Sequence, residues 1–596
     1  MQKYSVNQHL IETLLTWVKS GEIAIPEIQR PFVWDSSKVR DLMDSLYQGF
    51  PVGYVIAWRN PNVRLKDGSM SEGKKILIDG QQRVTALTAA LLGEYVIDKT
   101  YQRVKIKIAF NPILEKFEVQ NPAILKDHTW IPNIAEAVSG EISILKLVRN
   151  YLAVNPEADE DLVERAFTNL INIPKKQIGI IELSHDLDIE TVTEIFIRIN
   201  SKGVVLSQAD FAMSKIASNT EYQGNVLRKA IDYFCHLAIS PEFYKHIVDN
   251  DPEFAKTEFF AKMQWLKSEN EDLYDPEYTD LIRVAFTSQF NRGRLSDLVS
   301  LLSGRNFETR SFEDSIAEQS FEKLKQGVFN FINETHFKRF IMIIKSAGFI
   351  SPKLIRSQNA LNFAYILYLK LRELGVNSVH IESYVKRWFV YSVLTGRYSG
   401  SPESVFDFDI KQIHNRPFDE YLKEKEEGEL SEAFWNASLP QSLDTSVASS
   451  PYFNVFLASQ VKANDRGFLS KDVLVGDLIS LRGDIHHLFP RDFLKKNGLD
   501  RGKYNQIANY VYMQSEINIK VGNKPPKEYF ELVNSQIVSD NRLVSGLASQ
   551  EELLANLKAN CVPAEIMTMG LEDYQDFLVM RRKLMAQKIK DYYFSL

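Results

Sequence analysis

Apolar residues along the first 110 positions recur in two different patterns. Over 39–47 they return every three or four residues, the spacing of a helix with one buried face, and a second helix is predicted over 81–92, directly after a glycine. Three short apolar or alternating runs bounded by turn residues predict strands, at 53–58, 75–78 and 105–110. Because strands and helices mix in this stretch, we expect the chain to begin with an α/β domain.

The pattern becomes helical further along the chain. A buried strand is predicted over 177–183, followed by a helix through about residue 199. From about 205 to 396 nearly all of the periodicity is that of helices, with clear examples at 321–344, 362–374 and 378–394. This stretch is most simply a separate helical domain.

Composition changes between residues 399 and 450. SGSPES, the charged run EKEEGE and SLPQSLDTSVASSP are typical of loops or linkers. The last stretch, 551–596, is helical again and carries the basic run Arg581-Arg582-Lys583. We therefore expect a multidomain α+β protein with five segments: an α/β domain 1–215, a helical domain 216–400, a linker region 401–450, a second functional domain 451–540 and a helical C-terminal extension 541–596.

Length and charge narrow the classes of protein. A chain of 596 residues is too long for one hydrophobic core, and its 44% hydrophobic and 25% charged residues are those of an ordinary folded protein. The formal net charge is −6, so binding to nucleic acid cannot depend on a global positive field and would need local basic patches.

Cysteine usage and the N-terminus indicate a reducing cytoplasm. The two cysteines, Cys235 and Cys561, form no CxxC pair, so neither cysteine-bound zinc nor a disulfide is expected. The N-terminus lacks the basic and apolar regions of a signal peptide, and no apolar run reaches the roughly 18–20 residues of a membrane helix. No membrane partner is expected.

A candidate phosphate site follows the strand predicted at 75–78. Gly80 permits a tight turn into the next helix, whose N-terminal N–H groups and positive dipole end favour an anion. Arg83 adds a forked cation suited to phosphate. Asp79 is placed to hold a metal or a water, and Gln81 or Gln82 to orient one. The alternative is an ordinary turn followed by a solvated arginine.

Two other segments are expected to converge on this site. IPEIQRPFVW supplies Gln29 and Arg30, and FIRINSKG supplies Asn200 at a predicted helix end. A near match to the P-loop at 68–75 is rejected, because Lys75 replaces the magnesium-binding hydroxyl and the segment leads into a strand instead of out of one.

The two adjacent histidines, His486 and His487, are the most informative pair in the chain. They are the only two neighbours among ten histidines, and they lie in DIHHLFP. Asn509 follows His487 by 22 residues, and Asn518 follows Asn509 by nine. The spacing fits a β-hairpin followed by a helix. A histidine that takes a proton, beside a group that holds a divalent metal, is what hydrolysis of a phosphodiester requires.

These residues resemble the three motifs of the His-Me finger (HNH) nucleases, which have a ββα-metal fold. The resemblance implies that His487 is the general base and that Asn509 fixes the loop. It also implies that His486 and Asn518 are metal ligands, for Mg²⁺ or Mn²⁺. Many members of that family have aspartate in place of His486 and histidine in place of Asn518. Asp484 either orients a histidine or contacts the metal. Each residue alone would more often be a capping or surface residue.

IPEIQRPFVW, IDGQQR and FIRINSKGVVLS resemble the amino-terminal domain of GmrSD-type, modification-dependent restriction enzymes. The resemblance covers residues 1–215 and 480–530. It implies a ParB/sulfiredoxin-like fold that binds and hydrolyses a nucleoside triphosphate, fused to a His-Me finger nuclease. The implied nucleotide-binding residues are Asp79, Gly80, Gln81, Gln82, Arg83, Gln29, Arg30 and Asn200.

Together these features predict an NTP-dependent, divalent-metal-dependent DNA endonuclease of prokaryotic anti-phage defence that senses DNA modification. The expected partners are DNA and a nucleoside triphosphate, with a homo-oligomer left open. One alternative is an NTP-controlled DNA-binding regulator whose nuclease fold is inert, and another is an RNA-cutting toxin. No residue identifies the modification, the nucleotide or the cleavage position.

Overall fold

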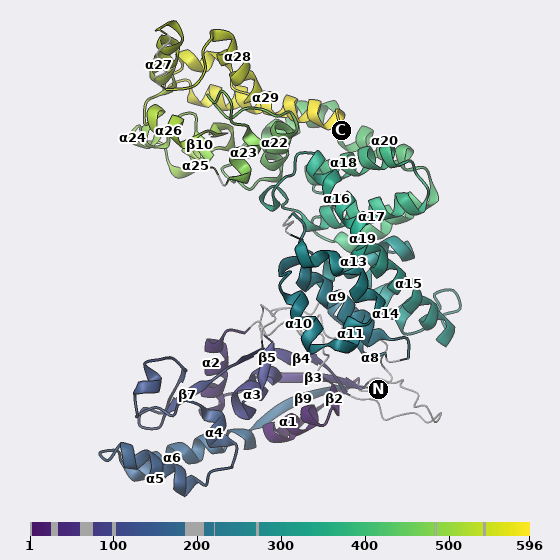
Figure 1. Ribbon diagram of the computed structural model, residues 1–596, viewed down its shortest axis with the longest axis vertical. Coiled ribbons are helices and arrows are strands. Elements are labelled where there is room, and N and C mark those ends of the chain that lie inside the picture. The colour runs from purple at the N-terminus through teal and green to yellow at the C-terminus, as the bar shows by residue number, and fades with distance from the viewer. Residues whose placement is uncertain are drawn as a thin grey trace. The chain divides into compact units, whose positions relative to one another are not determined.

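The chain forms two compact units, one of 1–228 with 299–312 and the other of 229–298 with 313–596. The structure is a computed structural model (Figure 1). It describes residues 3–24, 34–59, 75–97, 103–184, 187, 208–219, 221–269, 273–481, 483, 485–539 and 544–596.

The first unit is built on a five-stranded mixed sheet with the order β1-β9-β3-β4-β2 (Figure 1). β9 lies antiparallel to β1 and parallel to β3, and β4 lies antiparallel to β3 and parallel to β2. The strands of this sheet are β1 (Tyr4–Leu10), β2 (Ile23–Ala24), β3 (Tyr54–Arg59), β4 (Lys75–Asp79) and β9 (Gln177–Leu183). The mixed order places the end of β4 beside the start of β3.

Helices and short hairpins complete this unit. The hairpin strands are β5 (Tyr95–Ile97), β6 (Arg103–Lys105), β7 (Ile108–Asn111) and β8 (Lys116–Val119). The helices are α1 (Ile11–Lys19), α2 (Ser36–Tyr47), α3 (Gln81–Leu92), η1 (Ile124–Lys126), α4 (Ile134–Val138), α5 (Ile144–Val154), α6 (Glu160–Ile171), η2 (Ile173–Lys175) and α8 (Gln208–Ser218).

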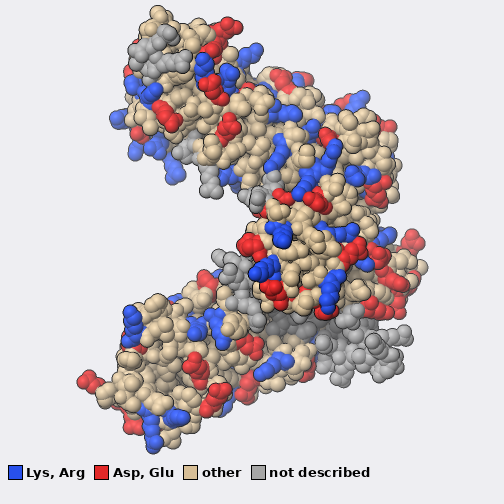
Figure 2. Space-filling view, in the orientation of Figure 1, with Lys and Arg blue, Asp and Glu red and all other residues tan. Residues whose placement is uncertain are grey.

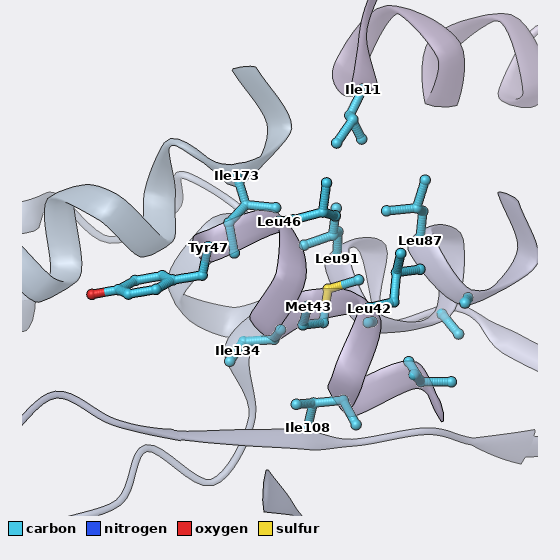
Figure 3. Close-up of a cluster of buried hydrophobic side chains, with 14 of the residues drawn as sticks. Ile11, Leu42, Met43, Leu46, Tyr47, Leu87, Leu91, Ile108, Ile134 and Ile173 are labelled. Atoms are coloured by element: carbon cyan, nitrogen blue, oxygen red, sulfur yellow. The ribbon is translucent and has the colours of Figure 1, made fainter. Parts of the chain in front are cut away.

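The core of the first unit lies between its helices and the sheet. Leu42, Met43 and Leu46 recur at helical spacing on α2 and are all buried. They lie with Leu87 and Leu91 of α3 in one apolar cluster (Figure 3). Burial of each such side chain contributes roughly 1.5–3 kcal/mol, so this cluster fixes α3, and with it the turn at its start, against the sheet.

The second unit is mainly helical. Its first part comprises α9 (Gly224–Ile239), α10 (Phe243–Asn250), α11 (Pro252–Ala255), α12 (Glu258–Lys262), η3 (Gln264–Ser268), α13 (Tyr278–Phe290), α14 (Leu295–Leu302), α15 (Asp314–Ile332), α16 (Glu334–Ser346), η4 (Pro352–Leu354), α17 (Gln358–Glu373) and α18 (Ser378–Thr395). α9 and α14 cross the boundary between the units.

The rest of the second unit adds one small hairpin to further helices. These elements are α19 (Pro402–Asn415), α20 (Phe418–Glu429), η5 (Phe434–Ser438), α21 (Leu439–Ser442), α22 (Pro451–Lys462), α23 (Val475–Ser480), β10 (Ile485–His487), α24 (Arg491–Lys496), α25 (Arg501–Tyr504), η6 (Ile507–Asn509), β11 (Tyr510–Tyr512), α26 (Ser515–Val521), α27 (Pro526–Ser539), α28 (Gln550–Ala559), η7 (Ala564–Thr568) and α29 (Tyr574–Phe594).

The linker expected over 401–450 is wrong for most of that range, because α19, α20, η5 and α21 occupy it. Phe406, Tyr421 and Trp435 are buried there. The charged run EKEEGE lies on α20, where Lys425 faces Glu429 one turn away. The run is thus the solvated part of an amphipathic helix, and 443–450 is the longest stretch of this range without a helix or strand.

Two single elements expected from the sequence are split in the structure. The helix predicted over 321–344 is interrupted at Asn333, whose side chain accepts from the His336 N–H and starts α16. The strand predicted over 105–110 is broken at 106–107, between β6 and β7. Strand β1 was not expected at all. The helix predicted after 183 lies outside the described residues.

Among the described residues, no helix combines the length and the apolar content needed to cross a bilayer.

Candidate active site

The adjacent histidines lie on a short hairpin, as the sequence predicts. β10 pairs antiparallel with β11, with His486 opposite Val511 and His487 opposite Tyr510. α26 begins three residues after β11 ends, so the order is strand, strand, helix. Asn509 immediately precedes β11, and Asn518 lies within α26.

Asn505 fixes the orientation of His487. Its Oδ1 lies 3.0 Å from Nε2 of the half-buried imidazole. Because an amide oxygen only accepts, Nε2 carries the ring proton and Nδ1 is left as the basic nitrogen. Tyr510 packs edge-on against the ring, with centroids 5.0 Å apart. Burial lowers the pKa of His487, opposed by the Asn505 hydrogen bond, and this favours the neutral imidazole that a base requires.

The fully buried Asn509 joins the segment after β10 to the segment before β11. Its Oδ1 accepts from the Phe489 N–H at 2.8 Å, and its Nδ2 donates to the Phe489 carbonyl at 3.0 Å. Its own carbonyl accepts from the Leu488 N–H at 2.8 Å. Three hydrogen bonds therefore hold the turn that directly follows His487.

The C-terminal helices hold this segment from behind. Arg581 of α29 is completely buried, and its guanidinium donates to the carbonyls of Ala508, at 2.8 Å, and Asn560, at 3.3 Å. Burial lowers the pKa of Arg581 to about 10. Tyr574 of α29 donates to the Lys503 carbonyl at 2.9 Å. The expected C-terminal extension is thus packed into the same unit as the hairpin.

The residues expected to bind a metal are His486 on β10 and Asn518 on α26. Both side chains are half-buried. The described part of the chain contains no group of three His, Cys, Asp or Glu side chains able to hold a metal ion, and Asp484 lies outside it. One imidazole nitrogen and one amide oxygen fit a divalent ion that takes its other ligands from water and from phosphate.

A basic surface lies next to the hairpin. Between residues 491 and 503 five exposed cations outnumber two carboxylates, Asp492 and Asp500. Figure 2 shows blue side chains gathered over α24 and α25. The five cations are Arg491, Lys495, Lys496, Arg501 and Lys503. This surface, called here the α24–α25 surface, is the kind of local positive field that an acidic chain needs to attract a polyanion.

At the amino-terminal site the tight turn is present as predicted. Gly80 has φ +89°, and a β-carbon there would lie 3.1 Å from Cγ2 of Val55. Arg83, one turn into α3, donates from Nη1 to the Tyr54 carbonyl at 2.7 Å. Burial lowers the pKa of Arg83, and the charge of Asp79 opposes this shift. Arg83 is therefore half-buried and bonded to the turn, so it is not a fully solvated residue, and a phosphate site at this turn stays a prediction.

The amides beside it have structural contacts too. Gln81 donates to the Leu77 carbonyl at 3.2 Å, and the Gln82 side chain accepts from the Trp34 N–H at 3.4 Å. The second contact joins α3 to the end of the segment IPEIQRPFVW. Gln29, Arg30 and Asn200 lie outside the described residues, so the expected convergence of the three segments stays a prediction.

Sequence reasoning missed Asn505, Arg581 and Tyr574. Asn505 lies between the two recognised motifs, and no spacing rule distinguishes it from a surface amide. The run Arg581-Arg582-Lys583 looked uniformly basic, whereas Arg581 is buried, Arg582 pairs with Asp444 at 2.5 Å and Lys583 is exposed. The helical period is the available signal, because 574, 577, 578, 581 and 585 fall on the buried side of α29.

The first part of the chain matches a known protein family. Residues 11–217 match the family model described as "GmrSD restriction endonuclease, N-terminal domain". This range contains Gly80 and Arg83, and it ends well before the hairpin. This stretch of the chain is thus similar to the amino-terminal domain of GmrSD restriction endonucleases.

One curated relative is similar over nearly its whole length. The uncharacterized protein MJ0686 of Methanocaldococcus jannaschii is 22% identical over 642 aligned positions, covering 98% of each chain. The similarity therefore extends over both units.

Proposed function

We propose that the protein is a metal-dependent DNA endonuclease of the restriction type, controlled by a nucleoside triphosphate bound at the amino-terminal turn. The observation that carries the proposal is the hairpin arrangement: His487 is held by Asn505, and the turn after it is held by Asn509. The family match at residues 11–217 supports the restriction class and DNA as the substrate.

In the proposed reaction His487 acts as general base. Its Nδ1 takes a proton from a water molecule, and the water oxygen forms a new bond to the phosphorus of the scissile phosphodiester. The bond from phosphorus to one bridging oxygen breaks, that oxygen is protonated from solvent, and the His487 proton returns to solvent. The hydrogen bond from Nε2 to Asn505 stabilises the imidazolium that forms for part of this cycle.

His486 and Asn518 would hold the metal. A divalent ion such as Mg²⁺ or Mn²⁺ supplies charge stabilisation for the phosphate in the transition state. Both of these ligands are neutral, so DNA phosphate and water would supply the remaining oxygen ligands. The α24–α25 surface carries the rest of the backbone contact through Lys and Arg side chains.

The nucleoside triphosphate would bind at the start of α3. The helix dipole and the first N–H groups of α3 face the turn at Gly80, and Asp79 and Arg83 flank that turn. We propose that hydrolysis there is coupled to cutting. In a prokaryotic cytoplasm this coupling serves defence against phage DNA and restricts cleavage to modified DNA.

A second candidate is an NTP-controlled DNA-binding regulator with an inert nuclease fold. The neutral ligand pair favours it, because neither His486 nor Asn518 is a carboxylate and the described residues contain no group of three His, Cys, Asp or Glu side chains able to hold a metal ion. It predicts nucleotide-dependent DNA binding without cleavage under any divalent metal.

Supercoiled plasmid incubated with the full-length protein, a nucleoside triphosphate and Mg²⁺ or Mn²⁺ tests the proposal. We expect nicked or linear product with the native protein and with His414→Ala, an exposed histidine on α19, and none with His487→Ala. Product from His487→Ala at the native rate would remove the proposed base. Cleavage of RNA in preference to DNA would favour a toxin, and binding without cleavage would favour the regulator.

A further inference from the structure

A cavity of about 590 Å³ lies between α29 and the segment that orients His487. One wall is formed by Leu499, Lys503 and Gln506, and the other by the residues around the first two turns of α29. Its volume is in the range of roughly 300–1,000 Å³ that ligand sites in proteins have. Asn505, the hydrogen-bond partner of His487, is next to Gln506 in the chain, so the segment that orients His487 also forms one wall of this cavity.

The lining combines an apolar floor with cations at its edge. Leu499, Leu571 and Leu578 supply apolar surface that suits the face of a flat ring. Lys503 is exposed, so its ammonium group is available to a phosphate. Arg582 also lines the cavity and pairs with the lining carboxylate Asp444 at 2.5 Å. A ring joined to a phosphate is the chemistry of a nucleotide.

Gln506 adds a group able to read a base. Its Nε2 donates to the Gly502 carbonyl at 2.8 Å, and its Oε1 is buried without a hydrogen-bond donor in the part of the chain that the structure describes. A buried acceptor without a partner costs about 1–3 kcal/mol. When the amide turns toward the cavity, an exocyclic amino group of a base removes that cost.

One wall of the cavity belongs to residues 485–512, the stretch from β10 to β11 that is called here the proposed catalytic segment. Tyr574 lines the cavity and donates to the Lys503 carbonyl, and Arg581 donates to the Ala508 carbonyl on the other side of Asn505. The backbone is thus held on both sides of Asn505. A nucleotide that contacts Lys503 and Gln506 therefore contacts the residues on either side of Asn505, which sets the position of His487.

We propose that this cavity binds one unpaired nucleotide of the DNA strand beside the scissile phosphate, with its base on the leucines and its phosphate at Lys503. The inference rests on the proposed function, since it assumes a DNA substrate. Extrusion of a base costs a few kcal/mol and is easiest where a base is mismatched or damaged, so the cavity is a place where substrate DNA is selected before it is cut.

Fluorescence of 2-aminopurine tests the proposal without any cleavage. The full-length protein is added, in EDTA, to duplexes that carry the probe at successive positions. We expect a rise in fluorescence at one position or a few neighbouring positions, because the probe leaves the base stack. Gln575→Trp fills the cavity from an exposed position of α29. It should abolish the rise and weaken DNA binding roughly 5- to 150-fold, the loss expected for one stacked base.

The matched control is Gln587→Trp, the same substitution at an exposed position of the same helix outside the cavity; it should leave the rise unchanged. An unchanged rise in Gln575→Trp, or DNA binding without a rise at any position, overturns the proposal. Tight binding of free AMP that competes with DNA also overturns it, since the source would then be a free nucleotide. Plasmid cleavage without a rise in fluorescence contradicts only the proposed nucleotide site in the cavity. A rise in fluorescence without plasmid cleavage contradicts only the proposed nuclease activity.

Discussion

At the scale of single residues, the basic nitrogen of His487 depends on one neighbour. The Asn505 oxygen accepts from Nε2, which leaves Nδ1 free of a proton. A tyrosine ring on the paired strand restricts the imidazole from the side. The position of His487, the expected general base, therefore depends on the side-chain amide of Asn505.

Replacement of Asn505 by alanine should lower kcat for DNA cleavage roughly 10- to 100-fold, a part of the 10²–10⁴ that a positioned general base supplies. KM should change little, because Asn505 positions His487 and is not expected to bind DNA. Steady-state cleavage measures both constants. Asn505→Asp retains an acceptor oxygen and should restore most of the rate; a rise in KM with unchanged kcat would show that Asn505 binds substrate instead.

The turn at Gly80 has an equally local requirement. Its φ of +89° is a conformation that residues with a β-carbon rarely adopt, and a β-carbon would lie only 3.1 Å from Val55. Gly80→Ala should therefore destabilise the start of α3 by about 1–3 kcal/mol. Hydrogen exchange of the α3 amides in urea measures the change. Gly428→Ala, inside α20 with nothing within 4 Å, should be neutral or stabilising. Equal exchange of the α3 amides in Gly80→Ala and in Gly428→Ala would contradict the strain expected at Gly80.

At the scale of elements, α29 holds the proposed catalytic segment in place. Its Arg581 is the donor for two buried carbonyls, at Ala508 and Asn560. At the far end of the same helix Tyr593 donates to Glu426 of α20 at 2.6 Å, and Lys590 pairs with Glu432. One helix thus ties the proposed catalytic segment to the helical part of the second unit.

Arg581→Ala should destabilise this region by about 2–5 kcal/mol, because two buried carbonyls lose their donor and a cavity remains. Hydrogen exchange of the Leu488 and Phe489 amides, which Asn509 holds, measures the loss of stability locally. Lys583→Ala, an exposed change on the same helix, should stay within about 0.5 kcal/mol. Protection of those amides that is identical in the two variants would show that α29 does not hold the proposed catalytic segment.

Elements with a clear period were predictable from the sequence. The helix expected over 81–92 and the strand expected over 177–183 have the bounds of α3 and β9, because each is an uninterrupted apolar pattern next to a turn residue. The break at Asn333 was not predictable, since the apolar period continues across it and only the cap to His336 marks it. EKEEGE looked like a linker because charge hides the buried Tyr421 of the same helix.

The candidate sites likewise contain residues that the sequence indicates and residues that it does not. Local motifs indicated Gly80, the two histidines and both asparagines, because strand, turn and helix signals surround them. The supporting residues are far from them in sequence: Arg581 reaches Ala508 across 73 positions. Such a contact depends on how helices pack, and one sequence carries no local sign of it.

At the scale of the whole molecule, the local charge next to the hairpin is opposite in sign to the net charge of the chain. A chain of net charge −6 carries five exposed cations against two carboxylates between 491 and 503. The α24–α25 surface is therefore a local excess of positive charge on an acidic chain, and the proposed DNA contact is assigned to it.

The salt dependence of DNA affinity tests this distribution. The double change Lys495→Gln with Lys496→Gln should reduce the slope of log K against log salt by about 1.8, near 0.9 for each phosphate that is no longer neutralised. Fluorescence anisotropy at several salt concentrations measures it. Two exposed lysines elsewhere, Lys256→Gln with Lys423→Gln, should leave the slope unchanged. A slope that falls equally in both pairs would mean that DNA binds without a preferred surface.

The role of His487 as general base is measured most directly by the single-turnover rate of DNA cleavage with Mg²⁺ or Mn²⁺, for the native protein and for His487→Ala. With enzyme in excess, product release and weakened binding do not limit the rate. We expect the variant to be slower by roughly 10²–10⁴-fold, the size of a general-base contribution, with DNA affinity retained. A His487→Ala rate within a few-fold of the native rate would contradict this role.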